Sequence, residues 1–245
     1  LSVLVTRPQA QAENLAAYIV EYGGNPLIFS TLGIESVEPP EGWDAILADL
    51  QQSDIVVFIS GNAVREVMPY WQTLRASTRV AAIGKATAAL LDANGVTADW
   101  LPMGDFRSEG LLALPAFADL AGKKVTLFAG EGGRDYLETQ LIERGAIVKK
   151  IAVYRRFRPD TDPDILQLFL ERDDRKIIIV TSATSLENLI EMAKPVGEIK
   201  MLTLLVISER LRKIALTLGF TDVVVAHEAS SEALITDLKN WYRCI

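Results

Sequence analysis

Polar side chains that could bind an anion follow several predicted strands of this sequence. Thr6 and Arg7 stand at the end of the predicted strand 3–6, and Ser60 follows the predicted strand 55–59. In an open parallel sheet, ligands bind outside the carboxyl ends of the strands. The guanidinium of arginine suits a carboxylate or a phosphate because it offers two N–H groups to two oxygens at once. One interpretation of this pattern is a site for a multiply charged anion.

The same kind of segment recurs along the chain and leaves two interpretations open. Hydroxyls and backbone N–H groups at a helix N-terminus can hold an anion. Ser, Thr and Asn are also the residues preferred as plain helix N-caps. The recurring segments are Ser60-Gly61-Asn62-Ala63, Gly84-Lys85-Ala86-Thr87, Ser108-Glu109-Gly110, Thr181-Ser182-Ala183-Thr184-Ser185, Ser208-Glu209-Arg210 and Ser230-Ser231-Glu232.

A glycine-rich segment and a group of basic residues could also bind or attract an anionic ligand. Residues 130–134 (Gly-Glu-Gly-Gly-Arg) follow a predicted strand, but they lack the Lys-Ser/Thr of a P-loop. Asp135 stands where a dinucleotide-binding loop has its third glycine, so the nucleotide interpretation is weak. Residues 123–158 hold nine basic side chains against four acidic ones. Such a segment attracts anions, although a charged strand edge that prevents aggregation explains it equally well.

Two further side chains could take part in proton transfer. Tyr154 lies inside the predicted strand 147–156, where its phenol could donate a proton or simply pack in the core. His227 follows the predicted strand 222–226 and has no evident partner in the sequence. We therefore expect His227 to be a bystander.

Composition and charge exclude several classes of protein. The chain has 245 residues with one His and one Cys (Cys244), so neither a Cys/His zinc site nor an internal disulfide can form. Its net charge of −7 argues against general nucleic-acid binding. No apolar run approaches the roughly 20 residues that span a bilayer, and no signal peptide is recognisable. We expect a cytoplasmic protein.

The elements that must position these residues alternate between short β-branched runs and longer amphipathic stretches. This alternation predicts parallel sheets covered by helices on both faces. Residues 55–60 correspond to 177–182 at an offset of 122, and residues 108–111 to 231–234 at 123. Each half is expected to hold five strand–helix units, one of them with a strand at residues 98–101. The predicted fold class is α/β, with two similar doubly wound, flavodoxin-like lobes.

Two long extended segments occupy equivalent positions in the repeat, and each ends at proline. Residues 30–38 and 149–158 could pair as a two-stranded antiparallel linker. The chain would then leave the first lobe, build the second and return. We expect a discontinuous first lobe of residues 1–35 and 159–245, a second lobe of residues 41–150, and hinge strands between them.

Together, these features resemble the uroporphyrinogen-III synthase family. The resemblance covers nearly the whole chain in order. It rests on the combination of the opening motif, the chain length and the tyrosine in the second hinge strand. The matching segments are Leu4-Val5-Thr6-Arg7-Pro8, Ser60-x-Asn62-Ala63-Val64, Ile83-Gly84-x-x-Thr87-Ala88, Ser108-Glu109-Gly110-Leu111, Gly132-Gly133-Arg134, Tyr154, Val180-Thr181-Ser182 and Ser208-Glu209-Arg210-Leu211.

The resemblance implies two α/β lobes joined by a two-stranded ladder, and it implies a cyclising hydro-lyase. Members of this family close hydroxymethylbilane, a linear tetrapyrrole polycarboxylate, to uroporphyrinogen III with inversion of ring D and loss of water. No metal or cofactor is implied, because the protein mainly supplies geometry. Tyr154 would donate a proton to the departing hydroxyl, and the carboxylates would be held by Thr6, Arg7, Ser60, Asn62, Thr87, Ser108, Arg134, Thr181 and Ser182.

The resemblance also implies which partners the protein has. One alternative function, without catalysis, stays open. We expect a small-molecule substrate, with channelling from the preceding deaminase as a further option, and neither nucleic acid nor membrane as a partner. No long exposed apolar stripe stands out, so a monomer is expected. The alternative is a bilobal small-anion binding or sensor module without catalysis. Product analysis separates the two, because a sensor returns its ligand unchanged.

Overall fold

The structure, a computed structural model, describes most of the chain. The described residues are 1–72, 74–228 and 230–243, so the single cysteine, Cys244, lies outside them. Within these ranges, no helix is both long enough and apolar enough to cross a membrane.

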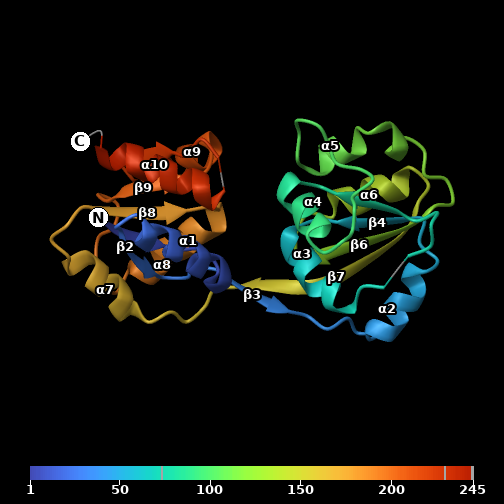
Figure 1. The fold of residues 1–245 in the computed structure, drawn as a ribbon, viewed down its shortest axis with the longest axis horizontal. Helices are drawn as coiled ribbons and strands as arrows, with labels where there is room; N and C mark the ends of the chain where they lie inside the picture. Colours follow the sequence, from blue (N-terminus) through green and yellow to red (C-terminus); the bar gives the residue numbers. More distant parts are fainter. Residues whose placement is uncertain (73, 229, 244–245) are drawn as a thin grey trace. The chain divides into compact units, whose positions relative to one another are not determined.

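The chain forms two compact units, each built around its own five-stranded sheet (Figure 1). The first unit combines Leu1–Gly33 with Phe157–Ile245, and the second comprises Ile34–Arg156. Parallel strand pairs make up the body of both sheets. The α/β class with two parallel sheets is thereby confirmed.

The sheet of the first unit has the order β10-β9-β8-β1-β2, and all neighbouring pairs are parallel. Its elements are β1 (Ser2–Val5), α1 (Gln9–Glu21), β2 (Asn25–Ile28), α7 (Pro163–Glu171), β8 (Lys176–Val180), α8 (Ala183–Ala193), β9 (Thr203–Val206), α9 (Glu209–Thr217), β10 (Val223–Val225) and α10 (Ser231–Arg243). Successive strand side chains face opposite ways. Leu4 and Ile178 therefore pack with α7, α8 and α9, whereas Val3 and Ile177 pack with α1 and α10.

The sheet of the second unit has the order β3-β7-β6-β4-β5. Its elements are β3 (Gly33–Ser36), α2 (Trp43–Leu50), β4 (Ile55–Phe58), α3 (Gly61–Val67), the 3₁₀ turn Met68–Tyr70, β5 (Arg79–Ala82), α4 (Lys85–Asp92), α5 (Ser108–Leu112), the 3₁₀ turn Pro115–Phe117, β6 (Lys124–Gly130), α6 (Tyr136–Glu143) and β7 (Ile147–Phe157). Phe58 packs with α2, α3 and α4 on one face, and Val57 packs with α5 and α6 on the other.

Segments related by the sequence repeat take equivalent places in the two sheets. β8 lies between β9 and β1, and its counterpart β4 lies between β5 and β6. The outermost position differs. The predicted strand 98–101 is reduced to a single parallel bridge between Trp100 and Ala81, where the first unit has β10. The repeat is therefore present in the topology, with one edge strand almost lost.

β3 and β7 contain the two extended segments noted in the sequence, and they are neighbours in the sheet. The Val37 N–H donates to the Val153 carbonyl at 3.0 Å, and Arg155 Nε donates to Glu35 Oε2 at 2.7 Å. Val37 thus faces Val153, and Glu35 faces Arg155. The residue numbers run in opposite directions along the two segments, so the pair is antiparallel. The hydrogen bond from Arg155 also holds the pKa of Glu35 below its usual value.

Candidate active site

The carboxyl ends of β4, β6 and β7 meet at one edge of the second sheet, and β7 runs past the end of β6. Gly130, the last residue of β6, pairs with Tyr154, and the register shifts between Ala129 and Gly130. The Glu131 N–H donates to the Tyr154 carbonyl at 2.7 Å. A bulge of this kind bends a strand and re-aims a side chain.

Gly130 also provides the space that the Tyr154 ring occupies. A Cβ on this residue would stand 2.6 Å from the Cε2 and Cζ atoms of the tyrosine, closer than side chains approach one another. The tyrosine is only 2% exposed. A glycine at the end of β6 therefore lets the phenol ring lie directly against the strand.

The Tyr154 hydroxyl has two polar partners from different elements. Ser60 Oγ lies 3.0 Å away, and Arg156 Nη2 donates to the phenol oxygen at 2.9 Å. The Arg156 guanidinium also stands 5.2 Å from the ring centroid, within cation–π range. Two of the predicted site residues, Tyr154 and Ser60, thus meet in the structure.

Arg156 was not among the predicted site residues. Side chains two positions apart on a strand point to the same face, so Tyr154 and Arg156 share one side of β7. That spacing is the signal in the sequence that would have identified Arg156.

Ser60 combines both roles that the sequence left open. Its Oγ accepts a hydrogen bond from the Ala63 N–H at 3.3 Å and so caps α3. The same oxygen lies beside the Tyr154 hydroxyl. Capping fixes the position of the serine, and the fixed serine in turn helps to fix the phenol.

Two other predicted ligands of the second unit lie on the helices that follow β4 and β5. Asn62 is half-buried in the first turn of α3, and its Oδ1 accepts from Arg65 Nη1 at 3.3 Å. Thr87 lies in the first turn of α4 and is only 5% exposed. Asn62 is therefore open to a ligand in part, whereas Thr87 is nearly enclosed.

The loop after β6 lies beside the start of α5. Arg134 is exposed, and its Nη1 stands 3.8 Å from Glu109 Oε1. Ser108 is half-buried and is the first residue of α5. Lys85 Nζ stands 5.2 Å from the ring centroid of Phe106. This lysine belongs to one of the recurring segments but was not a predicted site residue. Cationic side chains thus follow both β5 and β6.

The hydroxyl of Thr6 points into the first unit. Thr6 is 0% exposed, and its Oγ1 donates to the Ile179 carbonyl at 2.8 Å. The Thr6 hydroxyl also lies 3.1 Å from Ser185 Oγ, which in turn lies 2.7 Å from Thr31 Oγ1. These three side chains form a buried hydroxyl cluster between strand ends and α8. The expectation that the Thr6 side chain holds a carboxylate therefore does not fit its environment.

The remaining predicted ligands of the first unit lie at the carboxyl ends of β1 and β8. Arg7 is half-buried, and the loss of hydration lowers the pKa of its guanidinium, although arginine stays charged at neutral pH. Its Nη1 donates to Ser231 Oγ at 3.4 Å, at the start of α10. Thr181 is half-buried. Ser182 Oγ accepts from the Ser185 N–H at 3.0 Å and caps α8.

His227 has a partner that the sequence did not suggest. Its Nδ1 lies 2.8 Å from Asp237 Oδ1, and its backbone N–H donates to Asp237 Oδ2 at 3.0 Å. The carboxylate comes from α10 and holds the histidine on the surface of the first unit. Among the described residues, no group of three or more His, Cys, Asp or Glu side chains is placed to hold a metal ion.

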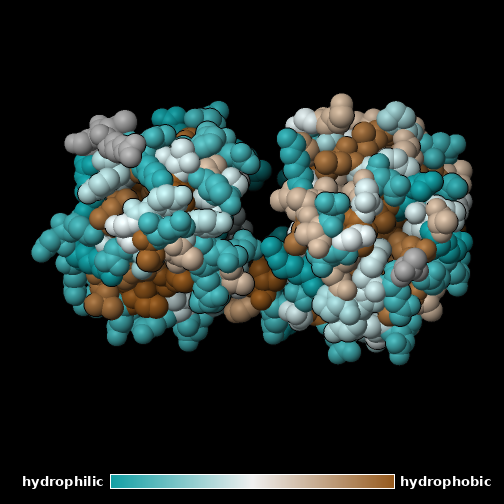
Figure 2. All heavy atoms as spheres, viewed as in Figure 1, coloured by the Kyte–Doolittle hydropathy of each residue, from teal (hydrophilic) through white to brown (hydrophobic). Residues whose placement is uncertain are grey.

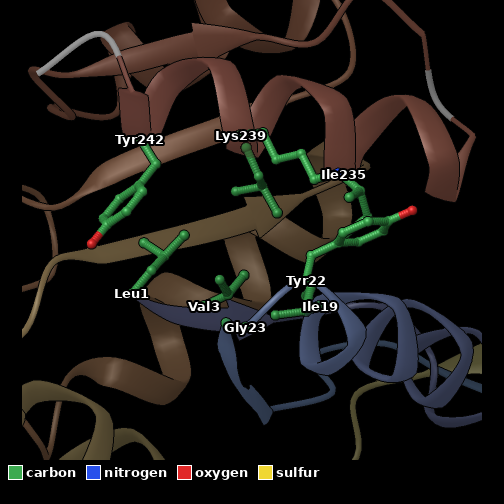
Figure 3. A pocket seen from close by; sticks show the side chains of 10 residues that line it. Leu1, Val3, Ile19, Tyr22, Gly23, Ile235, Lys239 and Tyr242 are labelled. Carbon is green, nitrogen blue, oxygen red and sulfur yellow. The ribbon is translucent and has the colours of Figure 1, made fainter.

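A small pocket opens near the amino end of β1 (Figure 3). Leu1 and Val3 line it together with Tyr22, Lys239 and Tyr242. Lys239 Nζ stands 3.3 Å from the ring centroid of Tyr22. The predicted ligands follow carboxyl ends of strands, so this pocket is separate from them within the first unit.

Known proteins match this chain along nearly its whole length. The model of the family described as uroporphyrinogen-III synthase HemD matches residues 13–236. The uroporphyrinogen-III synthase of Salmonella typhimurium is 31% identical over 251 residues, covering 98% of this chain and 100% of the relative. That of Escherichia coli is 30% identical over 246 residues, with the same coverage of 98% and 100%.

Solved structures share the fold. A mutant uroporphyrinogen III synthase from the extremely thermophilic bacterium Thermus thermophilus has a TM-score of 0.65 and 22% identity, covering 99% of both chains. The Helicobacter pylori enzyme also has a TM-score of 0.65, with 15% identity over 98% of this chain and 99% of the other. At these identities the likeness concerns the fold alone.

Proposed function

The chain belongs to the uroporphyrinogen-III synthase family, and on that premise we propose how its residues carry out the reaction. It is a cyclising lyase of tetrapyrrole synthesis that converts hydroxymethylbilane to uroporphyrinogen III, with inversion of ring D and loss of water. Without an enzyme, the same substrate closes to the type I isomer. Control of geometry is therefore the main task of the protein.

The observation that carries the proposal is the Tyr154 hydroxyl held by Ser60 and Arg156. A phenol in a fixed position can act as a general acid. Tyr154 donates its proton to the departing hydroxyl of the substrate, the C–O bond breaks, and water leaves. The resulting azafulvene cation is attacked by ring D. The phenolate regains a proton when the macrocycle loses one on closure, so the residue is restored after each turnover.

The substrate carboxylates need positive charge and N–H donors, because the protein as a whole carries a net charge of −7. Arginine supplies charge with a two-pronged donor geometry, and helix N-termini supply backbone N–H groups. The Thr6 hydroxyl is occupied inside its own unit and supports the fold instead. The proposed carboxylate ligands are Arg7, Thr181 and Ser182 on the first unit and Asn62, Thr87, Ser108 and Arg134 on the second.

Turnover of freshly prepared hydroxymethylbilane tests the role of Tyr154, with type I and type III uroporphyrin separated after oxidation. The wild-type enzyme should give type III in excess of the protein-free control. Tyr154→Phe should lower kcat by about 10²–10⁴-fold, the usual contribution of a general acid, with little change in KM. Tyr136→Phe, at an exposed tyrosine that begins α6, is the matched control. An unchanged kcat in folded Tyr154→Phe would contradict the role.

We also propose the assembly and location of the enzyme. It acts as a monomer in the cytoplasm and can receive its substrate from the preceding deaminase. Hydrophilic side chains predominate on the face of each unit shown in Figure 2, although hydrophobic patches interrupt them on both units. A dimer mass in size-exclusion chromatography with light scattering would contradict the monomer.

The predicted domain boundaries are part of the same proposal. Residues 30–38 and 149–158 are proposed as hinge strands between two domains. Residues 39–42 and 159–162 follow them outside helices and strands. Limited proteolysis should cut these two segments first, and initial cleavage inside either unit would contradict the boundaries.

A further inference from the structure

The partners of the Tyr154 hydroxyl decide where its proton can point. An arginine side chain donates hydrogen bonds and accepts none. The phenol oxygen must therefore be the acceptor in the 2.9 Å contact with Arg156 Nη2. One lone pair of the oxygen is thereby used, and the phenol proton cannot lie along that contact.

The contact between Ser60 and Tyr154 has two possible directions. Ser60 Oγ already accepts from the Ala63 N–H. If Tyr154 donates to Ser60, the serine proton is the one without an acceptor in the part of the chain that the structure describes. If Ser60 donates to Tyr154, which its rotatable hydroxyl allows, the phenol proton is the one without a protein acceptor. That arrangement leaves the tyrosine proton for a ligand.

The guanidinium of Arg156 also has different partners from that of its neighbour Arg155 on β7. Arg155 pairs with Glu35 at 2.7 Å. Within the described ranges, no carboxylate lies within salt-bridge distance of Arg156, and its recorded contacts are the hydroxyl and the ring of Tyr154. Alternation along the strand explains the difference, because neighbouring residues face opposite sides.

We propose that Arg156 and Ser60 are positioning residues that direct the Tyr154 proton toward the substrate and stabilise the phenolate left behind. This inference rests on the proposed role of Tyr154. Once the proton has moved to the departing hydroxyl, the phenolate oxygen keeps two donors, one of them on a cation. Hydrogen bonds between charged partners are markedly stronger than neutral ones. Arg156 and Ser60 therefore favour the state that forms during the reaction.

A double-mutant cycle tests whether Arg156 acts through the tyrosine. The variants are Tyr154→Phe, Arg156→Gln and their combination, with Arg155→Gln as the matched control on the opposite side of the same strand. Arg156→Gln should lower kcat by about tenfold or more, with KM within about twofold, because its donor acts on charge that develops during the reaction. Adding Arg156→Gln to Tyr154→Phe should cost nothing further, because the oxygen that Arg156 contacts is gone.

A spectroscopic measurement tests the contact without relying on activity. Tyrosines labelled with ¹³C at Cζ report the hydrogen bonds of their hydroxyls, and loss of one signal in Tyr154→Phe assigns that residue. Arg156→Gln and Ser60→Ala should each shift this signal, and Arg155→Gln should leave it in place. An unmoved signal in Arg156→Gln would overturn the inference.

The outcomes separate this inference from the proposed function. Full turnover by Tyr154→Phe overturns the role of the tyrosine and the inference with it. If Tyr154→Phe has a low kcat and adding Arg156→Gln lowers kcat further by its full single-mutant factor, only the inference is overturned. A raised KM with unchanged kcat in Arg156→Gln also overturns only the inference, because it identifies Arg156 as a ligand of a substrate carboxylate. If Arg155→Gln and Arg156→Gln have the same melting temperature, a loss of folded protein does not explain a lower kcat in Arg156→Gln alone.

Discussion

Two hydroxyl residues that follow buried strands have opposite surroundings. Ser60 Oγ lies at a sheet edge beside the phenol of Tyr154. Thr6 Oγ1 turns inward to the Ile179 carbonyl and joins Thr31 and Ser185 in the buried hydroxyl cluster. A buried hydroxyl is retained only when it is hydrogen-bonded. Thr6 therefore contributes to stability, and Ser60 to the candidate active site.

Thr6→Val is expected to destabilise the enzyme by about 1–3 kcal/mol, because it leaves the buried Ile179 carbonyl and Ser185 hydroxyl short of a partner. Urea unfolding measures the change. Thr236→Val, at an exposed threonine that bonds to Glu232 on its own helix, is the control and should have a much smaller effect. Equal stability of the two variants would show that the cluster contributes little.

At the scale of elements, the irregular end of β7 has the largest consequence for the site. A regular ladder would pair Gly130 with Val153, whereas the shifted register pairs it with Tyr154. The extra length of β7 also places Arg156 beyond the end of β6. A bulge with a glycine opposite the tyrosine therefore places both Tyr154 and Arg156.

Gly130→Ala is expected to displace the Tyr154 ring, because the new methyl group would stand 2.6 Å from it. The ring is almost fully buried and cannot swing into solvent. We expect a fall in kcat similar in direction to that of Tyr154→Phe, together with a lower melting temperature. Gly84→Ala, where a Cβ meets open space at an ordinary φ of −136°, should lower the melting temperature much less, because it only weakens an N-cap. A fully active Gly130→Ala would show that the exact ring position is unimportant.

At the scale of the whole molecule, an acidic protein must bind a polyanion. The net charge is −7, but the cationic side chains of Lys85 and Arg134 follow the ends of β5 and β6. Attraction at contact distance outweighs the weaker repulsion from distant acids, which salt screens beyond about 10 Å at 0.1 M. Binding therefore depends on where the charges lie and less on their sum.

Raising the salt concentration from about 50 to 300 mM should raise KM several-fold and leave kcat nearly unchanged, because exposed ion pairs with the substrate are screened. Arg134→Gln should raise KM at low salt and weaken the salt dependence. Arg172→Gln, at an arginine that contacts Ser2 near the amino end of β1, is the control for loss of one charge. A KM independent of salt would contradict ligand binding by exposed arginines.

Local patterns in the chain were enough to predict the α/β class, the two repeated parallel sheets and the polar strand ends. Strand–helix alternation and N-cap residues act over a few neighbouring positions, so one sequence reveals them. The contacts of the site required the folded chain. Ser60 meets Tyr154 across 94 positions, and Thr6 meets Ser185 across 179. Strand order and one register shift bring these groups together, and neither is encoded in a local pattern.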